Sequence, residues 1–155
     1  MNKFFAIAFA LTTFAATASA QTATQQVSIN VAEIAVISVG GNIAMNINQA
    51  TAGQAPDPTT ALSTYHVTTN GKNKKITAEL SSKMPTGLTL NATMAAPNGA
   101  SSSGKKALSN KAKDLVTGIT RVRGTGLQLT YEAVATVDAR PDNYSRTVTY
   151  TITNN

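Results

Sequence analysis

The sequence predicts an all-β protein, an immunoglobulin-like β-sandwich of seven to nine strands with Greek-key connections. Short segments in which apolar and polar residues alternate recur along the chain, and clusters of Gly, Pro, Asn and Asp separate them. The chain is also rich in Thr, Asn, Ser and Ala, a composition that suits exposed strands and turns better than long helices. A β-barrel is the alternative architecture.

Residues 1–20 have the features of a secretory signal peptide. A basic residue precedes an apolar run that is too short to span a bilayer. Ala18 and Ala20 then form an A-x-A cleavage motif directly before Gln21. We therefore expect a secreted mature protein, residues 21–155, that folds as one domain and has no membrane span after cleavage.

Composition limits what can hold this domain together. All 4 Phe lie in the signal segment, and the chain has no Trp and no Cys. The core of the mature domain must therefore consist mostly of Val, Ile, Leu, Ala and Met, without disulfides. The mature chain is basic but carries few charges.

The segment 25–39 opens the mature domain with clean period-2 alternation. Val27, Ile29 and Val31 share one face, and polar residues occupy the other. At residues 32–33 the apolar positions change parity, which sends later side chains to the opposite face. This segment is either one strand with a bulge or two short strands with separate roles.

The same alternation predicts the remaining strands. Asn70-Gly71 is the strongest hairpin signal in the chain and should join the strands on either side of it. The last two strands are long and adjacent in sequence, so we expect them to pair antiparallel. The predicted strands after residue 39 cover residues 43–47, 63–69, 75–81, 88–94, 119–122, 127–137 and 144–153.

One short helix is predicted between the strands. Apolar residues fall at helical spacing across residues 108–115, and Ser109 is a suitable N-cap. Residues 96–106 have the composition of a flexible surface loop. Residues 123–126 contain two glycines and are expected to form a turn.

No combination of residues predicts an active site or a metal site, so we expect no enzyme activity and no cofactor. His66 is the only histidine and falls on the predicted exposed face of its strand. With one His and no Cys, a zinc or copper site has too few soft ligands. Asp138 and Asp142 could share a calcium ion, but Arg140 lies between them and a plain turn is favoured.

Phosphate and nucleic-acid binding are not predicted either. Gly124-Thr125-Gly126 precedes a strand, whereas a phosphate cradle needs the loop to open a helix. Lysines cluster at 72–75 and 105–113 without the aromatic residues or basic helix face of nucleic-acid binders. Solvated loop charge is the favoured interpretation of both clusters.

The layout of the chain resembles the cysteine-free major subunits of chaperone–usher fimbriae of the colonisation-factor type. The matching pieces are the alternating segment 27–31, the Thr- and Lys-rich stretch 69–76, and residues 143–145 leading into the closing strand 147–153. The closing strand also resembles that of bacterial immunoglobulin-like surface modules. The resemblance implies an incomplete sandwich, which is filled by an N-terminal strand from the next subunit.

This resemblance also suggests the role of the N-terminal segment. Val27, Ile29 and Val31 would be the donor residues of a homopolymer, with a periplasmic chaperone as a further partner. The leading hypothesis is therefore a structural subunit of an extracellular surface fibre, assembled by donor-strand exchange. The alternative is a monomeric secreted or periplasmic module that binds a glycan or a protein, in which the same strand completes its own sandwich.

Overall fold

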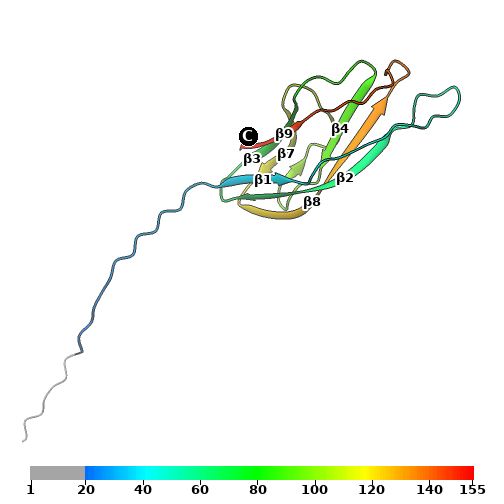
Figure 1. Ribbon diagram of the computed structural model, residues 1–155. Helices are drawn as coiled ribbons and strands as arrows, with labels where there is room; N and C mark the ends of the chain where they lie inside the picture. Colours follow the sequence, from blue (N-terminus) through cyan, green and yellow to red (C-terminus); the bar gives the residue numbers. More distant parts are fainter. Residues whose placement is uncertain (1–19) are drawn as a thin grey trace, which may run out of the picture. The chain divides into compact units, whose positions relative to one another are not determined.

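The computed structural model describes residues 20–155, of which Ala32–Asn155 form one compact unit built from nine β-strands (Figure 1). No described residue is helical. The strands are β1 (Ala35–Val39), β2 (Thr59–Thr69), β3 (Lys74–Leu80), β4 (Leu88–Met94), β5 (Ser101–Ser102), β6 (Lys106–Ala107), β7 (Lys113–Ile119), β8 (Val122–Ala135) and β9 (Val148–Asn154).

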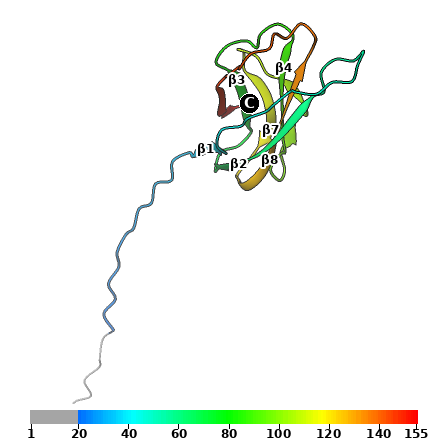
Figure 2. The ribbon, with the colours of Figure 1, turned by 45° about the vertical axis from the view of Figure 1, so that its right-hand side comes forward.

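These strands form two antiparallel sheets that pack against each other (Figure 2). The first sheet has the order β1-β2-β8-β4-β6, and the second has the order β5-β7-β3-β9. From β3 onward, each strand lies in the opposite sheet from the strand before it. The predicted all-β sandwich is confirmed, and its connections cross between sheets almost everywhere.

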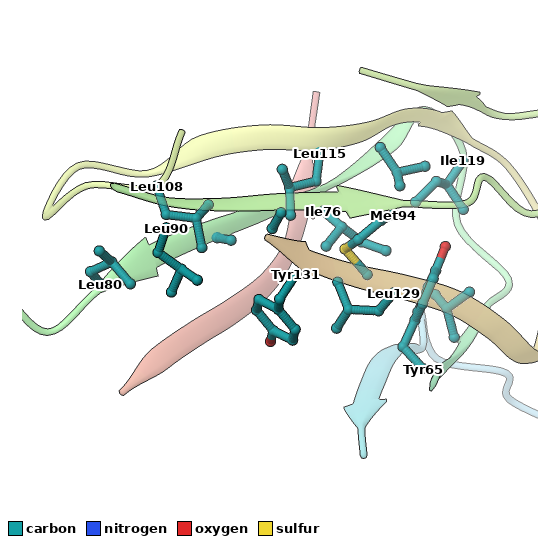
Figure 3. Close-up of a cluster of buried hydrophobic side chains, with 14 residues drawn as sticks. Tyr65, Ile76, Leu80, Leu90, Met94, Leu108, Leu115, Ile119, Leu129 and Tyr131 are labelled. Carbon is teal, nitrogen blue, oxygen red and sulfur yellow. The ribbon is translucent and has the colours of Figure 1, made fainter. Parts of the chain in front are cut away.

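The core lies between the sheets and consists of the inward-facing residues of both (Figure 3). Tyr65 and Val67 of β2, Ile76 of β3 and Leu129 of β8 are at most 1% exposed, which confirms the inward faces predicted for these strands. Burying each side chain of this size contributes roughly 1.5–3 kcal/mol. The Tyr65 hydroxyl donates to the carbonyl of Ala95, which satisfies its one polar atom.

The predicted helix at 108–115 is wrong. Leu108 and Leu115 are buried as their pattern required, but they belong to extended backbone beside β6 and within β7. Ser109 forms an isolated bridge with Lys111 instead of a helix cap. Two buried leucines at this spacing are compatible with a bent, extended segment as well as with a helix. Tertiary contacts, which the local pattern does not contain, decide between the two conformations.

Both strand pairings predicted from adjacency in sequence are also wrong. The residues around Asn70-Gly71 carry the chain from β2 in one sheet to β3 in the other, so they do not form a hairpin. Likewise β8 pairs with β2 and β4, while β9 pairs with β3. Residues 136–147 therefore cross between the sheets.

Two further predictions need correction. Residues 43–47 form no strand, although Met45 and Ile47 are half-buried as the alternation requires. Residues 123–126 are not a turn but part of β8, next to an irregularity in its pairing with β2. There Gly126 has φ +62°, a conformation that glycine adopts without strain.

Candidate functional site

The last strand, β9, has a free edge. It pairs with β3 along its whole length, and no described strand pairs with its other side. Its inward residues Val148, Tyr150 and Ile152 are only half-buried, whereas Ile76 and Ala78 on neighbouring β3 are fully buried. An open edge presents unpaired N–H and C=O groups to any extended chain that approaches.

The first sheet is also open on this side of the sandwich. Its edge strand β1 lies close to β9, and residues 41–49 continue from β1 without joining a strand. Met45 in this stretch packs against the core. At the opposite side the edges are β5 and β6, which have 2 residues each and are too short to template a new strand. Among the described edge strands, β1 and β9 are therefore the only ones longer than 2 residues.

The described N-terminal segment, residues 20–31, carries three strongly exposed apolar side chains. Val27, Ile29 and Val31 are 73%, 84% and 73% exposed. Residues 20–31 belong to no strand in this structure, so the strand predicted for 27–31 is not formed within the single chain. These three apolar side chains at alternate positions are therefore left exposed to solvent in the single chain.

Asn70 attaches residues 32–34 to the end of β2. The N–H of Ile34 donates to Asn70 Oδ1 at 2.6 Å, and the Asn70 N–H donates to the Ile34 carbonyl at 3.2 Å. Asn70 Nδ2 in turn donates to the carbonyl of Ala32 at 2.8 Å, and the Thr69 hydroxyl to that of Ile34 at 2.8 Å. These bonds extend the β1–β2 ladder beyond β1 and hold residues 32–34 extended.

Lys74 lies at the same end of the sandwich and is buried, with its side chain 7% exposed. Its amine donates to the carboxylate of Glu33 and to the side-chain oxygen of Asn154. A buried ammonium group is tolerated when it is paired and hydrogen-bonded in this way. Gly71 leaves room for the lysine, because a Cβ at that position would lie 2.6 Å from Lys74 Cε. We call Asn70, Lys74 and Glu33 the linker clamp.

A second polar pair connects the two sheets. The hydroxyl groups of Tyr131 on β8 and Tyr150 on β9 are hydrogen-bonded to each other. Burial raises the pKa of Tyr150 far above its ordinary value, and its bond to Tyr131 raises it further. Burial also raises the pKa of Tyr131, although its bond to Tyr150 partly opposes this. Both hydroxyls therefore stay protonated in the folded protein well into the alkaline range.

No protein-family model, no curated protein and no solved structure matches this chain.

The residues considered for catalysis and metal binding are dispersed. His66 is exposed on β2, and its Nδ1 accepts a hydrogen bond from the Gly126 N–H at 3.2 Å. Asp138 interacts with Thr136 within its own loop. No group of three metal-ligating side chains occurs among residues 20–155.

The first lysine cluster differs in part from its predicted character, whereas the lysines of the second cluster, at residues 105–113, are exposed to solvent as expected. Lys74 is buried in the linker clamp and is not part of a solvated loop. Lys75 on β3 pairs with Asp114 at 3.3 Å, and Lys105 pairs with Glu132 at 2.8 Å. The hydrogen bond from Lys105 is the main reason that the pKa of Glu132 is lowered. Several of these lysines are thus paired with acidic side chains.

The predicted cleavage motif falls at the limit of the described residues. Ala18 lies outside them, while Ala20 and Gln21 are exposed. Among residues 20–155, no helix is present that could cross a membrane.

Sequence reasoning missed the linker clamp. Glu33 was visible only as the point where the alternation changes parity, and Asn70 only as a turn residue. The one signal in the sequence that could have pointed to this site is the position of Glu33, a charged residue at the point where the apolar alternation changes parity.

Proposed function

We propose that this protein is a structural subunit of an extracellular fibre, and that the N-terminal strand of each subunit completes the sandwich of a neighbour. The observation that carries the proposal is a pair of complementary features in one chain. One is the open edge of β9. The other is the exposed apolar face formed by Val27, Ile29 and Val31.

The two features match in length and pattern. Residues 27–31 supply three apolar side chains at period 2. The inward face of β9 has three half-buried side chains at the same period, Val148, Tyr150 and Ile152. An extended segment added to β9 would pair its backbone with the free edge and turn its apolar face toward the core. It would thereby cover both incomplete surfaces at once.

The burial involved is large enough to drive assembly. Transferring three side chains of this size from water to a core is worth roughly 5–9 kcal/mol before ordering costs. That range is comparable with the whole stability of a typical domain, about 5–15 kcal/mol. A subunit with a filled edge should therefore be far more stable than one with an open edge.

The resemblance to chaperone–usher fimbrial subunits supports the same proposal. The signal peptide predicted from Ala18, Ala20 and Gln21 would bring the chain out of the cytoplasm. A periplasmic chaperone would cover the open edge until a neighbouring subunit replaces it. The assembled fibre would stand on the cell surface, with no catalytic step and no cofactor.

The test places one charge on either face of the donor segment. Ile29→Asp introduces a carboxylate that would have to be buried in the neighbour's core, at a cost of several kcal/mol. Asn30→Asp introduces a carboxylate one residue later, on the face that stays in solvent. We expect Ile29→Asp to abolish fibres in negative-stain microscopy and size-exclusion chromatography, and Asn30→Asp to leave them intact.

Equal behaviour of the two variants would contradict the proposal. If the wild-type protein remained a stable monomer at every concentration, the binding-module alternative would be favoured instead. The two variants change the net charge equally and differ only in the face of the donor segment that carries the new charge. A difference between them therefore reports burial of the apolar face and not the added charge itself.

A further inference from the structure

We propose that the linker clamp prevents a chain from inserting its own N-terminal strand, so that the strand is always given to a second copy. This inference rests on the proposed function. It adds the structural feature that favours donation of the strand to a second copy over insertion into the chain's own sandwich, which we call self-capture. Its basis is the position at which the donor segment joins the sandwich.

That position is the carboxyl end of β9. Lys74 and Asn154 face each other in the β3–β9 ladder, and Asn154 is the last residue of β9. The Lys74 amine binds the side chains of both Asn154 and Glu33. Residue 32 therefore leaves the sandwich beside the end of β9, with Val31 bonded directly to it.

Self-insertion antiparallel to β9 is ruled out by chain length. In that orientation Val31 would have to lie beside Val148, at the start of β9. The strand has 7 residues, so its two ends lie about 20 Å apart. Bonded residues such as Val31 and Ala32 have Cα atoms only about 3.8 Å apart. No spare residues connect the donor segment to its attachment point.

Self-insertion parallel to β9 requires a sharp reversal. Val31 would then lie near Asn154, and the chain would have to turn back within residues 32–34 to enter β1. Those residues are held extended by their hydrogen bonds to Asn70 and Thr69, and by the pairing of Glu33 with Lys74. A reversal breaks most of these contacts, so the clamp opposes the one route that chain length allows.

A second copy meets neither restriction. Its donor segment arrives from outside and can lie along β9 in either direction. The clamp thus keeps the free edge of β9 available and commits the occupant to another molecule of this protein.

The kinetic order of strand insertion tests this inference. Self-capture is unimolecular and independent of protein concentration, whereas donation is bimolecular. Full-length mature protein is unfolded and then refolded over a wide range of concentrations. Amide hydrogen exchange at residues 27–31 reports the inserted strand, and far-UV circular dichroism reports the folded sandwich.

The clamp is opened by Asn70→Ala combined with Lys74→Met. Lys75→Met is the matched control, because Lys75 is the next residue on β3 and its side chain pairs with Asp114 outside the clamp. In the wild type and in the control, protection of residues 27–31 should disappear on dilution. In the clamp variant, a protected monomer should persist at high dilution, with a population about tenfold above wild type. That is the change produced by about 1.4 kcal/mol.

Two results would overturn the inference. One is a folded clamp variant whose protection depends on concentration as in the wild type; donor-strand exchange would then stand without the clamp. The other is wild-type protection that is independent of concentration, which would overturn the proposed function as well. If the double variant does not fold, Asn70→Ala alone removes an exposed side chain and provides the same comparison.

Discussion

Two sets of hydrogen-bonded polar side chains hold β9 in place, one between the sheets and one at the end of the strand. Tyr150 reaches across the sandwich to Tyr131 on the other sheet, and Asn154 shares the amine of Lys74 with Glu33. These hydrogen bonds satisfy the buried Lys74 amine and the two tyrosine hydroxyls, and leaving such a group without a partner would cost about 1–3 kcal/mol. Side-chain hydrogen bonds thus help to position β9, which has a strand neighbour on only one side.

The tyrosine pair predicts a fall in stability at alkaline pH. Unfolded tyrosines titrate near pH 10, whereas burial raises the pKa of Tyr131 and Tyr150 in the folded state. The unfolded state therefore binds fewer protons above about pH 10, and the free energy of unfolding falls as the pH rises through that value and on toward the folded pKa.

This prediction is tested by urea unfolding from neutral to strongly alkaline pH. The variant in which both Tyr131 and Tyr150 become Phe should lose most of the alkaline slope. A residual slope should remain from Tyr65, because burial raises its pKa to about 12. An unchanged slope in the double variant would show that the two hydroxyls are ionised as readily in the folded protein as in the unfolded chain.

At the scale of elements, β9 differs from inner strands in how much its side chains contribute. Val148 on β9 is half-buried, whereas Val116 on β7 is fully buried. Truncating a buried side chain costs its transfer free energy and leaves a cavity, and a side chain at an open edge loses less. The same substitution should therefore have different effects at the two positions.

Valine-to-alanine substitutions at these positions test the open edge. Val116→Ala should lower the free energy of unfolding of the monomer by about 2–3 kcal/mol, and Val148→Ala by about 1 kcal/mol. In assembled material Val148 would be covered, so its substitution should cost more there than in the monomer. Urea titrations of monomer and polymer measure both effects. Equal costs for Val148→Ala in the two states would argue against a strand added beside β9.

Local alternation predicted which residues point inward, but it could not predict which strands pair. Tyr65, Ile76 and Leu129 are buried as their phase required, because that phase depends only on the backbone of one strand. Pairing depends on which sheet the next strand enters. Asn70-Gly71 looks like a hairpin turn in sequence, yet it serves a crossing between sheets. The burial of Lys74 was equally unpredictable, because its partner Glu33 lies 41 residues away.

At the scale of the whole molecule, the proposed export and the proposed assembly would both depend on the same end of the chain. Cleavage after Ala20 would leave the donor residues a short distance behind a new N-terminus. Intact-mass analysis of protein from its natural host should therefore give a chain that begins at Gln21. A mass that retains the Phe-containing run would contradict the export prediction and would leave a bulky apolar segment ahead of the donor strand.

Lys74 also determines how a fibre built in this way would bear tension. Each subunit would be pulled at β9, where it grips the neighbour's strand, and at residue 32, where its own strand leaves. Lys74 contacts Asn154 at the end of the first and Glu33 beside the second. Part of the load would therefore pass through the Lys74 side chain, and the remainder through the hydrogen bonds that hold residues 32–34 to the end of β2. A stretched fibre should yield first at this junction, while its sandwiches remain folded.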